Sequence, residues 1–346
     1  MSNVEAKVLH GASDLRALLP EWRELFAVCA DATPFQNPSW ISAWIEAFAP
    51  SRLITVEVRH QRRLVGIAPL LVYPKGSEQV LAFAGGGVSD YLGWLVDGDR
   101  GPWSDEVLFA FLRAVQDVPH WTVLDLTDLR CEDRVLRSAL GQGAQPHDVC
   151  FVLELPSNRE ELLNSFSKKQ RANIRCARSR LERAGGGTFE LANPGTLSRA
   201  LEELFTLHGS RWQTAGQPGV LHDPAVQQFH RLVAPALLPE GLLRLYQLRV
   251  GQRTIAATYS LFFRDTAYCY IQGFDPEFAE LSPGTLLMFH VIEDAVHHGL
   301  SRFDFLRGEE AYKLHWRPRA ENTYRIELTR AKLLQVISRS AEFQAA

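Results

Sequence analysis

Residues 267–316 read AYCYIQGFDPEFAELSPGTLLMFHVIEDAVHHGLSRFDFLRGEEAYKLHW, and they carry the signals of a strand, a loop, a helix, a second strand and a second helix in that order. Ser282 is a suitable N-cap, and Pro283 suits the first helical position, where its missing N–H costs nothing. We expect this helix to run to Gly299. Strands that alternate with helices predict an α/β domain.

The start of this helix is a candidate anion site. Because Pro283 has no N–H, the backbone N–H groups of Gly284, Thr285 and Leu286 are expected to be free and to point out of the helix. Glycine also lets a ligand approach the backbone closely. Every helix has such a terminus, so this signal is weak when taken alone.

Polar residues gather on the two strands of this segment. Tyr268, Tyr270 and Gln272 are expected to share one face, because side chains alternate along a strand. The second strand ends in a dense polar run, which suggests a site: Asp304, Arg307, Gly308, Glu309, Glu310, Tyr312, Lys313, His315 and Trp316. Plainer interpretations stay open for its members: an ion pair for Asp304, a helix surface position for Tyr312 and a solvated charge for Lys313.

Two stretches far apart in the chain predict the same strand–turn–strand unit, VEVRHQRRLVGIAPLLV at 56–72 and YQLRVGQRTIAATYSLF at 246–262. They align without gaps, so that Arg59 falls on Arg249. Helix-like sequence precedes each copy, and another strand with a glycine turn follows it. The repeat therefore predicts two related α/β halves.

Composition excludes several classes of protein. The 346 residues are 46% hydrophobic, which excludes a disordered chain, and the net charge of −3 does not call for a polyanionic partner such as DNA. Walker, GxSxG, HExxH and strand-linked GxGxxG motifs are absent. We expect no membrane span, no signal peptide, no metal and a cytoplasmic location.

The five cysteines are scattered, and we expect reduced thiols: Cys29, Cys131, Cys150, Cys176 and Cys269.

A basic helix is predicted at 168–183, where Ser167 and Gln170 fit the capping-box spacing. Its sequence, KKQRANIRCARSRLER, carries seven positive residues against the single acid Glu182. Two interpretations stay open: a solvated helix face, or a wall that binds an anionic ligand.

Several motifs together resemble a known family. They are TPFQNPSW at 33–40, AGGGVSDY at 84–91, FSKKQRANIR at 166–175, LFTLHGSRW at 204–212, LSPGTL at 281–286 and FDFLRGEEAYKLHW at 303–316. In this order they resemble the GNAT-fold acetyltransferases of the CelD type, which are related to the FemAB peptidyltransferases and are often linked to cellulose or exopolysaccharide biosynthesis. The usual [QR]xxGx[GA] loop of GNAT proteins is replaced here by LSPGTL, with one glycine.

The resemblance implies an α/β (α+β) fold built of tandem GNAT folds, each a mixed sheet flanked by helices. Residues 1–155 would form an acceptor-side half with a degenerate donor site, and residues 156–346 would form the half that binds the donor. The implied activity is transfer of an acetyl or other acyl group from acetyl-CoA (acyl-CoA) to an amine or hydroxyl of a small or glycan-related acceptor.

The resemblance and the motifs together assign candidate residues to roles. The catalytic candidates are Tyr312 as general acid, Asp304 or Glu310 as base, and Lys313. Donor binding is expected at Gln272, Gly273, Ser282, Gly284, Thr285, Leu286 and Arg307. Acceptor binding is expected at Asp90, Tyr91, Lys168, Arg171, His208, Arg211, Trp212 and Tyr270.

Two other functions stay open. A FemAB-like transferase would take an aminoacyl-tRNA as its donor, and the basic helix 168–183 would suit tRNA phosphates, although the acidic net charge disfavours tRNA. A non-catalytic glycan- or nucleotide-binding protein could keep the same fold, because fold does not fix function.

Overall fold

The computed structural model describes residues 4–97, 104–132, 143–214 and 216–345. These residues form two compact units: unit 1 consists of Met1–Asp148 and Asn322–Ala346, and unit 2 consists of Val149–Glu321. The described strands are β1 (Val4–His10), β2 (Leu53–His60), β3 (Arg63–Lys75), β4 (Glu78–Phe83), β5 (Leu95–Val96), β6 (Val123–Leu129), β7 (Gln145–Glu154), β8 (Thr188–Leu191), β9 (Leu243–Val250), β10 (Arg253–Phe263), β11 (Thr266–Phe274), β12 (Arg302–Arg307) and β13 (Arg319–Thr329).

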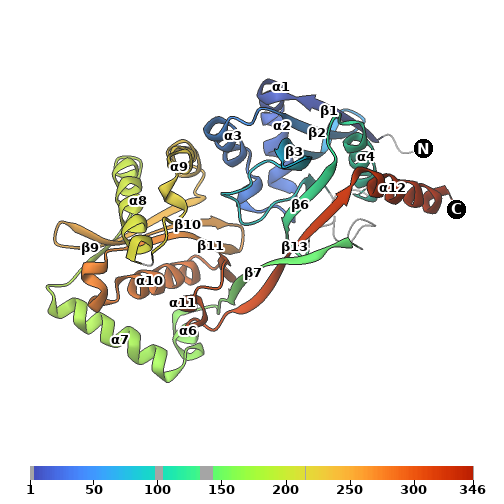
Figure 1. The fold of residues 1–346 in the computed structure, drawn as a ribbon. Helices are drawn as coiled ribbons and strands as arrows, with labels where there is room; N and C mark the ends of the chain where they lie inside the picture. The colour runs from blue at the N-terminus through green and yellow to red at the C-terminus, as the bar shows by residue number, and fades with distance from the viewer. Residues whose placement is uncertain (1–3, 98–103, 133–142, 215, 346) are drawn as a thin grey trace. The chain divides into compact units, whose positions relative to one another are not determined.

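Helices lie between and around these strands (Figure 1). The described helices are α1 (Gly11–Ala17), α2 (Leu19–Val28), α3 (Pro38–Phe48), α4 (Ser104–Asp117), α6 (Arg159–Ser165), α7 (Lys168–Arg183), α8 (Leu197–Thr214), α9 (Pro224–Leu237), α10 (Pro283–His297), α11 (Ala311–Leu314) and α12 (Arg330–Ala345). Short 3-10 helices are η1 (Pro34–Gln36), η3 (Val220–His222) and η4 (Pro276–Leu281). No helix among the described residues is both long and apolar enough to cross a membrane.

The two units share one sheet topology. In unit 1, β1, β2, β3 and β4 are antiparallel neighbours, and β6 lies parallel to β4 after the crossover helix α4. In unit 2, β8, β9, β10 and β11 are antiparallel neighbours, and β12 lies parallel to β11 after the crossover helix α10. The predicted mixed α/β fold with two related halves is therefore confirmed, and the repeated stretches form β2–β3 and β9–β10.

The strand that lies next to β6 in the sheet of unit 1, and the strand that lies next to β12 in the sheet of unit 2, each come from elsewhere in the chain. Strand β7, which follows β6, pairs with β12 through residues 150–154 of unit 2. Strand β13, which follows β12, pairs with β6 through residues 324–329 of unit 1. This exchange explains why residues 322–346 belong to unit 1, whereas we expected them in a second half of 156–346. Such a long-range pairing leaves no local sequence signal.

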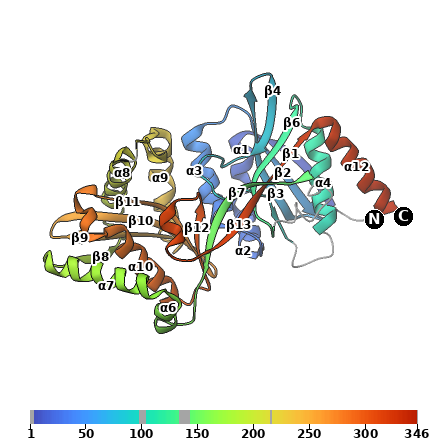
Figure 2. The same cartoon turned by 60° about the horizontal axis from the view of Figure 1, so that its bottom comes forward.

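Helices cover both faces of the unit 2 sheet, with α8 and α9 on one face and α10 and α7 on the other (Figures 1 and 2). Helix α10 is buried on most sides because it lies between strands β9–β11 and helices α6 and α7. Its sequence is accordingly apolar around much of its circumference. The core between α10 and the sheet includes Leu286, Leu287, Met288, Phe289, Val291, Ile292, Ala295 and Val296.

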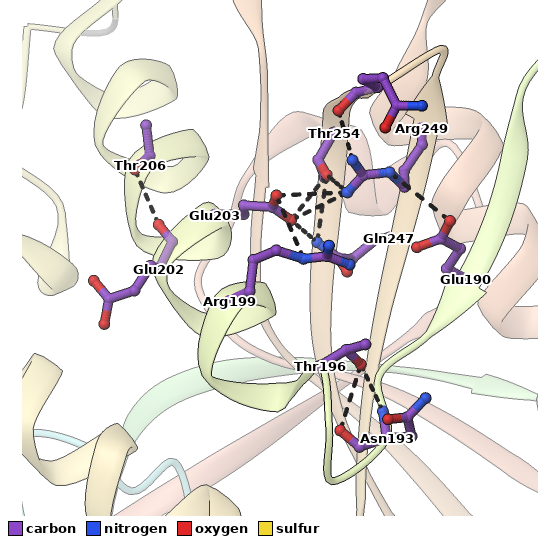
Figure 3. A network of polar contacts seen from close by, with 11 residues as sticks. Glu190, Asn193, Thr196, Arg199, Glu202, Glu203, Thr206, Gln247, Arg249 and Thr254 are labelled. Atoms are coloured by element: carbon purple, nitrogen blue, oxygen red, sulfur yellow. Dashed lines mark hydrogen bonds and ion pairs between the residues drawn. The ribbon is translucent and has the colours of Figure 1, made fainter.

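A polar network fixes α8 to the other face of this sheet (Figure 3). The Arg249 guanidinium donates to Thr254 Oγ1 at 2.6 Å and lies 3.5 Å from the Glu203 carboxylate of α8. Thr254 Oγ1 also donates to Glu203 at 2.9 Å, and Gln247 donates to the same carboxylate. In unit 1 the aligned Arg59 pairs with a helix carboxylate in the same way, at 2.6 Å. The duplicated hairpins thus share the contact that anchors a helix on the sheet.

Candidate functional site

A cavity of about 620 Å³ lies in unit 2, where the end of β11, the start of α10, helix α7 and helix α11 meet. This volume is in the ordinary range for small-molecule sites. The cavity is lined by Ser167, Lys169, Gln170, Asn173, Ile174, Cys176, Arg180, Arg211, Gln272, Phe274, Ala279, Ser282, Pro283, Gly284, Thr285, Met288, Tyr312, His315 and Trp316.

Charge in this cavity is of one sign. Lys169, Arg180 and Arg211 line it, and none of its lining residues, all within the described ranges, carries a carboxylate. The whole chain has a net charge of −3, so the concentration of cations here is local. A cavity of this kind attracts anionic ligands.

The start of α10 forms one wall. Ser282 has a left-handed backbone (φ 55°, ψ 50°), and its side chain does not cap its own helix. Instead, Ser282 Oγ accepts a hydrogen bond from Arg180 Nη2 of α7 at 2.8 Å. Pro283 is the first helical residue, as the sequence predicted, and the helix ends at His297, two residues before Gly299. A non-glycine residue in the left-handed region is uncommon and marks a backbone held by its surroundings.

The N–H groups of Gly284 and Thr285 precede the first hydrogen bond within α10, and both residues line the cavity. The prediction of a free N–H at Leu286 is wrong, because this group donates to the Ser282 carbonyl at 3.1 Å and the residue is buried in the core. A Cβ placed on Gly284 would meet only Phe274 Cδ1, at 3.6 Å, so the side chain of a larger residue would extend from here without a backbone clash.

Tyr312 brings a phenol to the cavity from α11. The Gln272 side chain hydrogen-bonds this phenol, and the Arg211 guanidinium lies 5.3 Å from the ring centroid, a cation–π contact. Burial is the main reason that the pKa of Tyr312 lies well above its ordinary value of 10; the nearby Cys269 and Glu310 add to the rise, and Arg211 opposes it. The phenol is therefore protonated at neutral pH and can act as a hydrogen-bond donor.

A β-bulge separates the polar residues of β11. Tyr259 pairs with Ile271 but Ser260 pairs with Cys269, so Tyr270 is an extra residue in the strand. The prediction that Tyr268, Tyr270 and Gln272 share one face is therefore wrong.

The two faces of β11 consequently carry different chemistry. Gln272 lines the cavity beside α10, whereas the Tyr270 ring packs 5.6 Å from His230 of α9 on the other side of the sheet. A Cβ on Gly273 would come within 2.3 Å of the His208 backbone nitrogen of α8. Gly273 therefore allows close packing of α8 against β11. Donor binding at Gly273 stays a prediction.

Lys313 is buried and binds the backbone of the loop that follows β12. Only 2% of its side chain is exposed, and Nζ donates to the carbonyls of Leu306 at 3.2 Å, Arg307 at 2.5 Å and Gly308 at 3.0 Å. Its ammonium also pairs with Glu310 at 2.9 Å. With these partners Lys313 holds the loop after β12, and neither it nor Glu310 lines the cavity. Arg307 does not line it either, so these three candidates lie outside the cavity.

Asp304 has a similar structural role. It is 5% exposed, and its Oδ1 accepts the Leu306 N–H at 2.8 Å. Leu306 itself is left-handed (φ 60°), at a bulge in the pairing of β12 with β7. The carboxylate thus stabilises the turn that leads to Tyr312, and it is not among the cavity residues that could act as a base.

Of the acceptor-binding candidates in unit 2, only Arg211 lines the cavity. His208 is 3% exposed and packs on Trp212 at 6.0 Å between ring centroids. Burial, followed by the charge of Arg211, lowers the pKa of His208 to about 4. His208, Trp212 and Tyr270 belong to the α8 and α9 side of the sheet, and their role in binding stays a prediction.

The basic helix α7 divides into two faces. Lys168 is exposed and does not line the cavity, and Arg171 Nη1 donates to the carbonyls of Leu163 and Phe166 at the end of α6, at 3.1 and 2.8 Å. The sequence predicts an anion-binding wall along this helix, but it does not identify the residues of α7 that line the cavity. Most of them are spaced by four, three and four positions, which places them on one helix face: Lys169, Asn173, Cys176 and Arg180.

Asp90 and Tyr91 lie in unit 1, in the loop between β4 and β5. Tyr91 is buried, with the Arg130 guanidinium 5.6 Å from its ring centroid, and the neighbouring Ser89 accepts the indole N–H of Trp40 at 3.0 Å. Binding of an acceptor by Asp90 and Tyr91 stays a prediction. Residues 98–103, which precede α4 in the sequence, lie outside the described residues, and the degenerate donor site also stays a prediction. No cluster of three or more metal-ligating side chains occurs in the described part of the chain.

Comparison with known proteins supports the GNAT fold. A family model described as "Acetyltransferase (GNAT) domain" matches residues 168–314, which include every residue of the cavity except Ser167, His315 and Trp316. Among curated proteins no sequence match is found.

Solved structures with similar folds cover almost the whole chain. The crystal structure of FemX is 14% identical with a TM-score of 0.64, over 96% of this chain and 99% of that chain. The C-terminal domain of a putative lysylphosphatidylglycerol synthetase from Agrobacterium fabrum is 10% identical (TM-score 0.56, 94% and 96% covered). L-PGS from Bacillus licheniformis is 13% identical (TM-score 0.56, 95% and 96% covered). At these identities the likeness is one of fold.

Proposed function

We propose that this chain is an acyltransferase whose unit 2 cavity binds a coenzyme A thioester and delivers the acyl group to an amine or hydroxyl. One observation carries the proposal: Lys169, Arg180 and Arg211 line the same cavity as the uncapped start of α10, and a protonated phenol stands in its wall. Cations and helix N–H groups suit a diphosphate, and the phenol suits a thiolate that leaves.

The family-model match over residues 168–314 supports the same reading, because the model describes an acetyltransferase domain. We take acetyl as the first acyl group to test. The resemblance of the sequence to the CelD type makes a small or glycan-related acceptor the first choice, in a role linked to cellulose or exopolysaccharide biosynthesis.

The reaction needs no covalent enzyme intermediate. The acceptor nitrogen or oxygen attacks the thioester carbonyl, and a backbone N–H at the end of β11, near Ile271 or Gln272, stabilises the oxyanion. As the carbon–sulfur bond breaks, the electron pair stays on sulfur and the Tyr312 O–H gives its proton to the thiolate. The acceptor loses its proton to water, and the phenolate regains one from water.

Ligand-dependent stability is the first test. Acetyl-CoA at about 100 times its dissociation constant should stabilise the fold by about 2.7 kcal/mol, which a thermal shift detects. Mass spectrometry of amine and glycan mixtures incubated with the chain and acetyl-CoA would then identify the acetylated acceptor. Absence of both stabilisation and acetyl transfer would contradict the proposal, and tRNA binding would favour an aminoacyl-tRNA donor.

A further inference from the structure

Gln170 has an unusual environment for a residue at its position. It is the third residue of α7, it is 9% exposed, and it lines the unit 2 cavity. Its backbone N–H donates to Ser167 Oγ at 3.1 Å, which is half of a capping box. The other half is missing, because Gln170 Oε1 is buried and has no hydrogen-bond partner.

A second glutamine in the same chain shows what the complete motif looks like. Gln36 is the third residue of η1, and its Oε1 accepts the Thr33 backbone N–H at 2.8 Å. Gln36 is 8% exposed, so the two glutamines are equally buried. The difference is that the Gln170 amide is not used by its own helix.

An unpaired buried polar group destabilises a fold, so its presence at a cavity wall calls for a partner from outside the protein. The terminal amide can turn by 180° and present either oxygen or nitrogen. A ligand amide, which carries both an N–H and a carbonyl, complements either arrangement.

The position of Gln170 along α7 indicates which part of a ligand it meets. Arg180, ten residues further on, bonds Ser282 at the anion-binding start of α10, and ten helical residues span about 15 Å. Just before α7, the Phe166 ring centroid lies 5.6 Å from that of Trp316, which follows α11, the helix that carries Tyr312. Gln170, Tyr312 and Trp316 all line the cavity. Gln170 is therefore near the reacting end of the cavity and distant from its anion-binding end.

We infer that Gln170 is a donor-binding residue that hydrogen-bonds an amide of the pantetheine arm of coenzyme A. This inference rests on the proposed function and adds α7 to the donor site as the wall along which the arm extends. Arg180 holds the diphosphate end, and Gln170 holds the arm close to the thioester.

Replacing Gln170 by Met, with Gln36→Met as the matched control, tests the inference by calorimetry and thermal melting. Gln170→Met removes an unpaired buried group, so the ligand-free variant should melt at the same temperature as the wild type or higher. Its affinity for coenzyme A should fall about three- to tenfold, as for the loss of one hydrogen bond, and its affinity for adenosine 3′,5′-bisphosphate, which lacks the arm, should not change. Gln36→Met should melt lower and bind coenzyme A normally.

The outcomes separate the inference from the proposed function. If the wild type does not bind coenzyme A, both are overturned. The inference is overturned while the proposed function stands if the wild type binds coenzyme A and Gln170→Met binds it equally well. The same holds if Gln170→Met loses affinity for coenzyme A and for adenosine 3′,5′-bisphosphate to the same extent. A drop in the melting temperature of Gln170→Met as large as that of Gln36→Met would assign the side chain a structural role and also overturn the inference.

Discussion

Replacing Gly284 by Asp should weaken donor binding without damaging the fold. The new Cβ would contact only Phe274 Cδ1 at 3.6 Å, and the carboxylate would stand at the second residue of α10, among the N–H groups that would bind the diphosphate. A negative side chain in the first turn of a helix stabilises it by about 0.3–1 kcal/mol, so the ligand-free variant should melt no lower than the wild type.

The size of the effect follows from Coulomb's law. Two unit charges about 6 Å apart repel by roughly 0.7 kcal/mol even at the dielectric constant of water, and a diphosphate carries at least two charges. We therefore expect at least ~1.4 kcal/mol of lost acetyl-CoA affinity, a tenfold change. Titration calorimetry measures the dissociation constant, and Gly284→Ala serves as the control because it adds the same Cβ without the charge.

Unchanged acetyl-CoA affinity in a folded Gly284→Asp variant would refute the placement of the diphosphate at the start of α10. An equal loss in Gly284→Asp and Gly284→Ala would also refute the electrostatic reasoning, because it would show that space and not charge limits binding.

Three further changes test other parts of the site. Tyr312→Phe should lower turnover about a hundredfold or more and change the donor dissociation constant by less than about threefold, since the proton is needed only as the carbon–sulfur bond breaks. If turnover in steady-state assays and donor affinity in binding assays fall by the same factor, the acid role is contradicted. Lys169→Glu, in the cavity lining, should weaken acetyl-CoA binding about tenfold, whereas Lys168→Glu, outside the lining, should not. Filter binding should detect no tRNA at physiological salt, and steep, salt-dependent tRNA association would support the aminoacyl-tRNA alternative. The pKa of His208 is lowered from 6.5 to about 4, so the folded state keeps a neutral ring that the unfolded state protonates below pH 6.5, and about 3 kcal/mol of stability is lost as the pH falls from 6.5 towards 4. The melting temperature of His208→Gln should therefore fall less steeply over this pH range than that of the wild type. An unchanged slope would show that His208 is not the group responsible.

The repeated topology could be predicted from the sequence because it rests on local patterns. The hairpins at 56–72 and 246–262 each carry their own turn, and the start of α10 is marked by Pro283. The exchange of β7 and β13 could not be predicted in this way. Each of these strands pairs with a distant part of the chain, and nothing in its own residues distinguishes one partner from the other.

Within the site, the errors have two physical causes. The bulge at Tyr270 is a single extra residue, and it moves every later side chain of β11 to the opposite face. The charge of Lys313 and Asp304 suggests a chemical role, but burial and their backbone partners give both a structural role. Only the tertiary structure determines whether such a charge faces a ligand or its own loop.

The most direct test of the donor site uses the two exposed cysteines of the native chain. Cys176 lines the unit 2 cavity, and Cys131 lies in unit 1, whereas Cys29, Cys150 and Cys269 are buried. Alkylation by a maleimide, followed by peptide mass spectrometry, gives the rate at each thiol with and without saturating acetyl-CoA, which as a thioester has no free thiol to consume the reagent. We predict that acetyl-CoA slows the labelling of Cys176 at least about tenfold and leaves Cys131 unchanged. Equal labelling of Cys176 with and without bound acetyl-CoA would contradict a donor site between α7 and α10.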